Sequence, residues 1–369
     1  MGVALSVVSI NIRMIPNEPL YFANDPQHRS WSGTSILAWT IMTYLEQGQD
    51  PLKLAHLPMT KACVRAMDTG AAIAKDKAGL NITKFIISGA SKRGWAVWLA
   101  AAVDKRVIAL SPIVYDLLSM IESLHHMYRA YGGWTFALKP FYKLNFTAEL
   151  DTPQAKVLQM IIDPIKYTDR LTMPKLIIDT TGDEYFMLDN PHYYFNQLKG
   201  PTYIDTIANA DHICVGHILE ILFAQKAFFQ HILNDVPLPK LTWKVDKKNN
   251  STKLTVFTDK TPKAVKAFRA ITIDERRDFR LFVADHSDPM HKKAIHPVAW
   301  FQQPVYQQSP TEFWVENVKG SYWTGFFIQV SYHGVESDSV LEFTTPTQIV
   351  PDTFPFEDCH GTGCRGKIV

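Results

Sequence analysis

The stretch KFIISGASKRGWAVWLAAAV, residues 84–103, indicates a strand that turns directly into a helix. It begins with β-prone and apolar residues, continues with a Gly-Ala-Ser turn, and ends in an alanine-rich segment that carries tryptophan. This order is typical of α/β folds, in which the turn exposes a nucleophilic serine or holds a phosphate at the start of the helix. The residues around Ser91 distinguish between these two chemistries.

A serine hydroxyl becomes a good nucleophile when a base accepts its proton and a strained turn exposes it. Gly89 and Gly94 permit a close approach of strand and helix, and Ser91 lies between them. The spacing is G-x-S-x-x-G, one residue longer than the G-x-S-x-G motif of α/β-hydrolases. We expect the backbone amide of Lys92 to be the first donor to an oxyanion, because it begins the helix.

A dinucleotide-binding loop is the competing interpretation of the same turn. Ser91 then takes the middle glycine position of G-x-G-x-x-G, and Asp116, after the next strand, lies near the position of a ribose-binding acid. A Cβ at the middle position obstructs the pyrophosphate, however, and the strand is not the first of the sheet. This alternative therefore ranks below a hydrolase.

The order of the downstream residues favours the hydrolase. In α/β-hydrolases the acid and then the histidine follow the serine, each at the C-terminal end of a strand. Asp183 follows the predicted strand KLIIDTT, and His212 follows TYIDTIA. We expect His212 to be the general base and Asp183 to orient its ring. His217 is the reserve base. The other candidate acids are Asp116, Asp179, Glu184 and Asp189.

The pattern of the whole chain predicts an α/β fold with a C-terminal β part. Strands alternate with helices over residues 1–238, which predicts an α/β-hydrolase-like, mostly parallel sheet flanked by helices, with a helical insertion at about 114–170. Short alternating strands over 239–346 predict a β-sandwich-like domain, and 347–369 form a tail. The first residues are predicted to be a strand, so that the sequence begins in mid-sheet, without the preceding strands and the second oxyanion loop.

The composition excludes several classes of function. The 38 basic and 36 acidic residues nearly cancel, so we expect no nucleic-acid partner. No apolar run is long enough for a membrane span, and the N-terminal residues do not have the pattern of a signal peptide.

The four cysteines indicate neither a disulfide scaffold nor a cofactor. Cys63 and Cys214 lie in apolar stretches and are predicted to be free thiols. Cys359 and Cys364 flank a glycine-rich turn, which favours a small disulfide over half a metal site. Neither the histidine pair at 125–126 nor the stretch 285–291 has a convincing ligand spacing, so we predict no metal.

Several segments together resemble the PhoPQ-activated pathogenicity-related protein family. They include GASKRGWAVWLAAAVDKRVIALSPIVYDLL, IIDPIKY, PKLIIDTTGDEYF and YYFNQLKGP, and the match spans most of residues 10–285. The resemblance implies an α/β-hydrolase-like domain with a C-terminal β domain in a secreted or periplasmic protein, with Ser91, Asp183 and His212 at the triad positions. GASKRG is also similar to the nucleophile region of glucuronoyl esterases.

Two functions remain as hypotheses from the sequence. The first is a serine hydrolase; kinship of one family member with dipeptidyl-peptidase-like enzymes implies a peptide substrate first and an ester second. The second is a secreted signalling or binding protein that keeps the hydrolase fold with little or no catalysis and engages a protein partner or receptor. The absence of the second oxyanion loop motivates this alternative.

Overall fold

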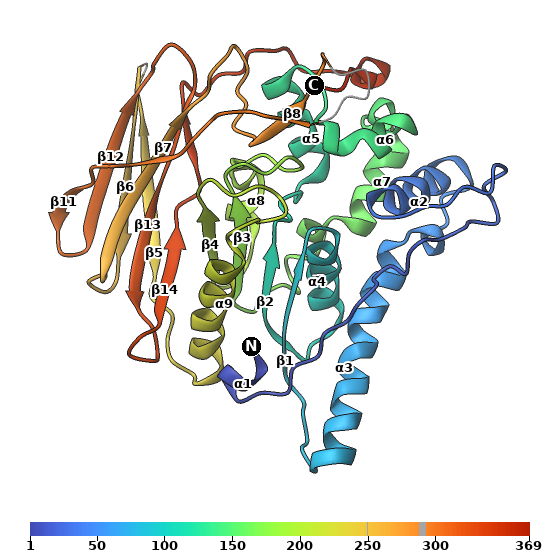
Figure 1. The fold of residues 1–369 in the computed structure, drawn as a ribbon, viewed down its shortest axis with the longest axis horizontal. Helices are drawn as coiled ribbons and strands as arrows, with labels where there is room; N and C mark the ends of the chain where they lie inside the picture. The colour runs from blue at the N-terminus through green and yellow to red at the C-terminus, as the bar shows by residue number, and fades with distance from the viewer. Residues whose placement is uncertain (249, 288–292) are drawn as a thin grey trace.

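A nine-stranded sheet forms the centre of the protein. The computed structural model describes residues 1–248, 250–287 and 293–369. The strands of this sheet are β1 (Phe85–Ala90), β2 (Val107–Ile113), β3 (Lys175–Thr180), β4 (Thr202–Ile207), β7 (Ala264–Ile271), β10 (Phe301–Gln303), β13 (Thr324–His333), β14 (Val340–Thr344) and β15 (Gln348–Val350). Their order is β1-β2-β3-β4-β14-β13-β7-β10, with β15 also paired to β13 (Figure 1).

The first four strands are parallel and carry helices on both faces. Helices α3 (His56–Ala78) and α4 (Lys92–Val103) pack together beside β1 and β2, and α9 (Ile218–Leu233) contacts β2 and β3 (Figure 1). Side chains of β3 alternate between the two faces, as a strand requires. Leu176 and Ile178 share a core with α9, whereas Ile177 belongs to the core around α4. The predicted parallel sheet with helices on both faces is therefore confirmed.

The segment between β2 and β3 is mostly helical and is packed into the larger core. It contains α5 (Met120–Tyr131), η2 (Phe136–Leu138), α6 (Lys139–Lys143), η3 (Phe146–Glu149), α7 (Pro153–Ile162) and η4 (Pro164–Tyr167). Helix α2 (Thr34–Glu46) contacts α6 and α7. Trp134 is completely buried in this core. The insertion is thus a packed helical layer above the carboxyl ends of the parallel strands.

The C-terminal part is a sandwich, and one of its sheets continues the central sheet. A four-stranded sheet of order β11-β12-β6-β5 consists of β5 (Leu241–Lys247), β6 (Ser251–Thr258), β11 (Tyr306–Ser309) and β12 (Glu312–Val318). Its residues Leu254 and Val315 share a core with Ile328 of β13. The junction is the antiparallel pairing of Thr344 in β14 with Ile204 in β4. The division at residue 238 stays a prediction, and the central sheet runs across it.

The N-terminal segment differs from the expectation, because it forms no strand of the sheet. Residues Gly2–Leu5 form the short helix α1, and the chain then runs outside the sheet, so that β1 is an edge strand (Figure 1). Ile10 packs against Gly70 of α3, where a Cβ would come within 1.9 Å of Ile10 Cδ1. Ile10 thus contacts a helix rather than a neighbouring strand, and a run of apolar residues in the sequence does not distinguish these two kinds of partner.

The C-terminal tail is anchored in the helical insertion. Its helical turn η6 (Gly361–Arg365) packs against η3, and Cys359 and Cys364 form a disulfide, as the sequence favoured. Trp134 Nε1 donates to the carbonyl of Cys364 at 2.9 Å, and the backbone of Val369 donates to Trp134. In the described part of the chain, no helix has the length and hydropathy needed to cross a membrane.

Candidate active site

Ser91 occupies a strained turn between β1 and α4. Its φ of 55° and ψ of −128° are unfavourable for a residue with a side chain, and such backbone strain is concentrated at functional sites. The flanking glycines explain the close approach of the two elements. A Cβ on Gly89 would lie 2.7 Å from the carbonyl oxygen of Arg93, and one on Gly94 would lie 2.9 Å from Tyr115 Cβ. The turn therefore requires both glycines of the motif.

Ser91, His212 and Asp183 are hydrogen-bonded in series. His212 Nε2 lies 2.8 Å from Ser91 Oγ, and His212 Nδ1 lies 2.8 Å from Asp183 Oδ2. The three side chains come from the turns after β1, β3 and β4, which all end at the same edge of the parallel sheet. Asp183 and His212 are buried, whereas Ser91 is half-buried and accessible. The arrangement can pass a proton from the serine to the imidazole.

The loop after β3 fixes the carboxylate of Asp183. Its Oδ1 accepts the backbone N–H groups of Tyr185 at 2.6 Å and Phe186 at 3.1 Å, which leaves Oδ2 for the imidazole. The rings of Tyr185 and Phe186 lie 4.3 Å and 5.8 Å from the His212 ring, measured between centroids. These aromatic rings restrict the orientation of the histidine. Both aromatic residues directly follow the acid turn, but no pattern in the sequence marked them as part of the site.

Glu184 is a second acidic residue at the histidine. Its Oε2 accepts the backbone N–H of His212 at 3.1 Å, so it holds the main chain of the loop rather than the ring. Burial raises the pKa of Glu184, and the Asp183 charge adds to this effect. Burial lowers the pKa of His212, but the carboxylates of Asp183, Glu184 and Asp211 together raise it by more, and the net pKa lies above the ordinary value of 6.5.

The alternative site residues have other contacts. Asp189 pairs with Arg277 at 2.6 Å, and His217 lies 2.9 Å from Glu220. Burial, together with the Asp183 charge, raises the pKa of Asp179 to about 8. Burial raises the pKa of Asp116 well above its usual range, and the nearby Asp179 adds to it. Only 2% of Asp116 is exposed, so it does not offer a carboxylate to a ribose.

The sequence matches a known family over most of its length. The family model of the PhoPQ-activated pathogenicity-related protein family matches residues 2–280. The chain belongs to this family. A curated relative, autocrine proliferation repressor protein A of Dictyostelium discoideum, is 34% identical over 380 aligned positions, which cover 97% of this chain and 75% of the relative. The expected family is therefore confirmed.

Solved structures with a partial likeness to this PhoPQ-related chain include an esterase and a peptidase. An acetyl xylan esterase from Paenibacillus sp. R4 is 15% identical, with a TM-score of 0.37, over 48% of this chain and 54% of the esterase. A puromycin-hydrolyzing peptidase of Mycobacterium tuberculosis is 20% identical, with a TM-score of 0.32, over 44% of this chain and 24% of the peptidase. The chain thus spans about half of the esterase and a quarter of the peptidase.

Lys92 begins α4, directly after the candidate nucleophile of this PhoPQ-related protein. The first N–H groups of a helix have no partner within the helix, and no side chain caps this one. Segment 15–34 lies over the same helix start: Glu18 forms an ion pair with Arg93 at 3.6 Å and accepts the backbone N–H of Gly33. No pattern in the sequence placed this segment at the site.

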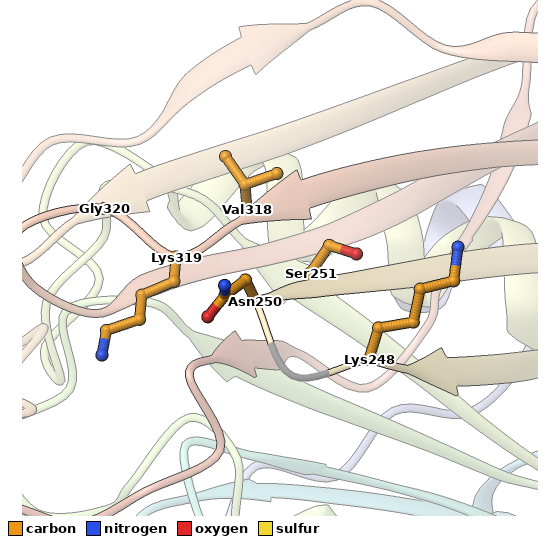
Figure 2. Close-up of a pocket in the computed structure, with 6 residues that line it drawn as sticks. All are labelled: Lys248, Asn250, Ser251, Val318, Lys319 and Gly320. Atoms are coloured by element: carbon orange, nitrogen blue, oxygen red, sulfur yellow. The ribbon is translucent and has the colours of Figure 1, made fainter.

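Two hollows lie outside the hydrogen-bonded series. An apolar cavity of about 30 Å³ lies between α2 and the insertion and is lined by Trp95, one helical turn after Ser91. The other is a shallow depression on the β-sandwich, lined by Lys248, Asn250, Ser251, Val318, Lys319 and Gly320 (Figure 2). Its two lysine side chains point away from each other, so the depression does not gather positive charge at one point.

The stretch 285–291, which the sequence suggested is not a metal site, is described only in part, because residues 288–291 lie outside the described part of the chain.

Proposed function

We propose that this PhoPQ-related protein is a serine hydrolase, with Ser91 as nucleophile, His212 as general base and Asp183 as the residue that orients the imidazole. The observation that carries the proposal is the pair of 2.8 Å contacts that link the three side chains at the carboxyl edge of the parallel sheet. A half-buried but accessible serine on a strained strand-to-helix turn, in contact with a buried histidine and acid, is suited to acyl transfer.

The first half of the reaction forms an acyl-enzyme. His212 Nε2 accepts the proton of Ser91 as Oγ attacks the substrate carbonyl, and the negative charge develops on the carbonyl oxygen. The Lys92 N–H at the start of α4 is the proposed donor to that oxygen. Asp183 accepts the Nδ1–H of His212, which presents Nε2 to the serine and stabilises the imidazolium. His212 then donates its proton to the leaving amine or alcohol.

Hydrolysis of the acyl-enzyme repeats these steps with water. His212 accepts a proton from the water molecule, the hydroxide attacks the ester carbonyl, and Ser91 leaves with the proton returned by the histidine. The substrates that we propose are peptides first and esters second. No cofactor or metal is needed for this sequence of proton transfers.

A second candidate is a binding or signalling protein that keeps the fold and engages a protein partner or receptor. One observation favours it: an apolar surface directly follows the candidate base. Five of its side chains are between 53% and 68% exposed: Ile213, Val215, Ile218, Leu219 and Phe223. Such a patch is typical of an interaction surface. For location, we propose an extracytoplasmic compartment, which the disulfide between Cys359 and Cys364 supports.

Labelling with a fluorophosphonate probe tests the hydrolase directly, because the probe reacts with activated serines. We expect the wild-type chain to be labelled, and the Ser91→Ala and His212→Ala variants to remain unlabelled while circular dichroism shows them folded. His217→Ala is the matched control, because this histidine contacts Glu220. Labelling that persists in Ser91→Ala, or a folded wild type without labelling, contradicts the proposal and favours the binding protein.

A further inference from the structure

The C-terminal disulfide lies against a histidine from a distant part of the chain. His125 belongs to α5 in the insertion, and its Nδ1 is 3.9 Å from the Sγ of Cys359. The three potential ligand atoms of His125, Cys359 and Cys364 all lie within 4.8 Å of one another. The histidine is more than 230 positions away from both cysteines in the sequence. The spacing of the two cysteines therefore did not indicate this third donor, which only the fold brings close.

Two carboxylates complete the surroundings of His125. Asp358 Oδ1 lies 2.8 Å from Nδ1, on the side of the sulfurs, and Asp151 Oδ1 lies 2.9 Å from Nε2. Asp151 is also held by the backbone N–H of Gly361. The His125 side chain is 13% exposed, whereas Cys359 and Cys364 are buried beneath it.

We propose that Cys359 and Cys364, once reduced, bind a zinc ion together with His125. The ligand atoms are the two thiolates and His125 Nδ1, and Asp358 supplies a carboxylate oxygen as the fourth. Asp151 does not bind the ion. It accepts the Nε2–H of His125 and fixes the ring, as the outer carboxylate commonly does at metal-bound histidines.

The donor set selects the type of ion. Two thiolates, one imidazole and one carboxylate suit a four-coordinate zinc, whereas calcium and magnesium prefer oxygen donors alone. A tetrahedral site needs ligand atoms about 3 to 4 Å apart, given metal–ligand bonds of about 2.0 to 2.3 Å. The two sulfurs and His125 Nδ1 lie within 4.8 Å of one another, and Asp358 Oδ1 lies 2.8 Å from that nitrogen, so the four donor atoms start close to this range.

The oxidation state of the two cysteines decides whether the site can bind zinc, because only the reduced thiolates are ligands. A dithiol reductant transfers two electrons and two protons to the Cys359–Cys364 bond; that bond breaks, two thiols form, and the reductant becomes a disulfide itself. Zinc then replaces the two thiol protons, which pass to solvent, and two Zn–S bonds form. In the oxidised state the contact of Asp358 with His125 links the tail to α5, and in the reduced state the metal adds a bond from the two cysteines to the same histidine.

Cobalt titration tests the proposal, because tetrahedral cobalt–thiolate sites absorb in the near ultraviolet and the visible. The full-length protein is reduced with dithiothreitol. The dithiothreitol is then removed under anaerobic conditions, and the protein is titrated with Co²⁺. We expect one equivalent to bind, Zn²⁺ to displace it, and the oxidised protein to show no such bands. A Cys63→Ser, Cys214→Ser double variant, which changes only the two free thiols, is expected to behave like the wild type.

Single variants identify the ligands. We expect Cys364→Ser to abolish the thiolate band, and His125→Ala to weaken binding at least tenfold. Asp151→Asn is expected to weaken it by about 10-fold or more, the usual effect of losing an outer-shell partner. His360→Ala is the matched control, since this ring lies 6.5 Å from that of His125 and is not a ligand.

Two outcomes overturn the proposal: a reduced wild type without stoichiometric cobalt–thiolate absorption, or a His125→Ala variant that binds cobalt as tightly as the wild type. Circular dichroism of each reduced variant shows whether it is folded. Fluorophosphonate labelling of Ser91 is measured in parallel and belongs to the separate hydrolase proposal, so failure of one proposal leaves the other unaffected.

Discussion

His212 Nε2 lies 2.8 Å from Ser91 Oγ, although 121 positions separate the two residues in the sequence. They meet because β1 and β4 run parallel and end at the same edge of the sheet, where the loops after them converge. Sites of α/β sheets form at the carboxyl ends of strands for this reason. The contact also depends on the strained backbone of Ser91, which directs the hydroxyl out of the turn.

Removal of the charge on Asp183 should disable the proposed nucleophile without unfolding the protein. Asp183→Asn keeps the shape of the side chain but favours the wrong tautomer of His212, so we expect the rate of fluorophosphonate labelling to fall by a factor on the order of 10³ to 10⁴. Asp179→Asn is the matched control. Its pKa of about 8 means that Asp179 is already neutral near pH 7. The labelling rate of Asp179→Asn at that pH should therefore differ little from that of the wild type. Equal losses in the two variants would argue against the assignment of Asp183.

The pH dependence of labelling should report the state of His212. The base must be neutral, and its pKa is raised above 6.5, so labelling should be lost as the pH falls through that raised value. The Glu184 charge contributes to the raised pKa. We therefore expect Glu184→Gln to shift the acidic limb of the rate profile to lower pH, whereas Glu220→Gln, which contacts His217 instead, should leave it in place. A shift to higher pH in Glu184→Gln would be inconsistent with this view.

Asp179 should make the protein less stable in mild alkali. Its carboxyl is neutral in the folded state up to a pKa of about 8 and ionises near 3.8 when unfolded. A folded pKa above the unfolded one stabilises the protein fully below pH 3.8, and this contribution is lost as the pH rises through 8. Asp179→Asn removes the dependence. We expect the melting temperature to fall between pH 5 and pH 8 by at least about 2 °C more in the wild type than in the variant, as thermal unfolding would show.

The Arg277–Asp189 pair should contribute strongly to stability, because it is buried where the loop after β3 meets the C-terminal part. Arg277 also lies 2.8 Å from His126 Nε2. Burial raises the pKa of Asp189, but Arg277 and His126 lower it by more, to below its usual range. Arg277→Met leaves this carboxylate buried without its main partner and should lower the free energy of unfolding by about 3 to 5 kcal/mol.

Chemical denaturation measures this loss. A second change, Asp189→Leu, removes the unpaired charge and should recover part of the stability in the double variant. Arg65→Met changes an exposed ion pair with Asp68 and serves as the control, with little expected effect. If the control loses as much stability as Arg277→Met, burial does not explain the result.

Much of the fold and the candidate site followed from local patterns. The strand-turn-helix at 84–103, the two glycines and the order of Ser91, Asp183 and His212 are short-range signals, and the described elements agree with them. The prediction of an N-terminal strand was wrong, because apolar residues that lie in a strand and apolar residues that pack on a helix look alike in the sequence. Glu184 was predicted only as an alternative acid and segment 15–34 was missed, since their contacts with the His212 backbone and α4 depend on how separate loops meet.

The sequence by itself determined the types of residues, their order and the conformation that the turn around Ser91 demands, because backbone preferences and strand alternation act over a few positions. Only the tertiary structure decided which acid contacts His212, that Asp179 is buried and neutral near pH 7, and that His125 lies beside the two tail cysteines. These properties depend on distances and burial between segments far apart in the chain, which are set when the sheet, the insertion and the tail pack together.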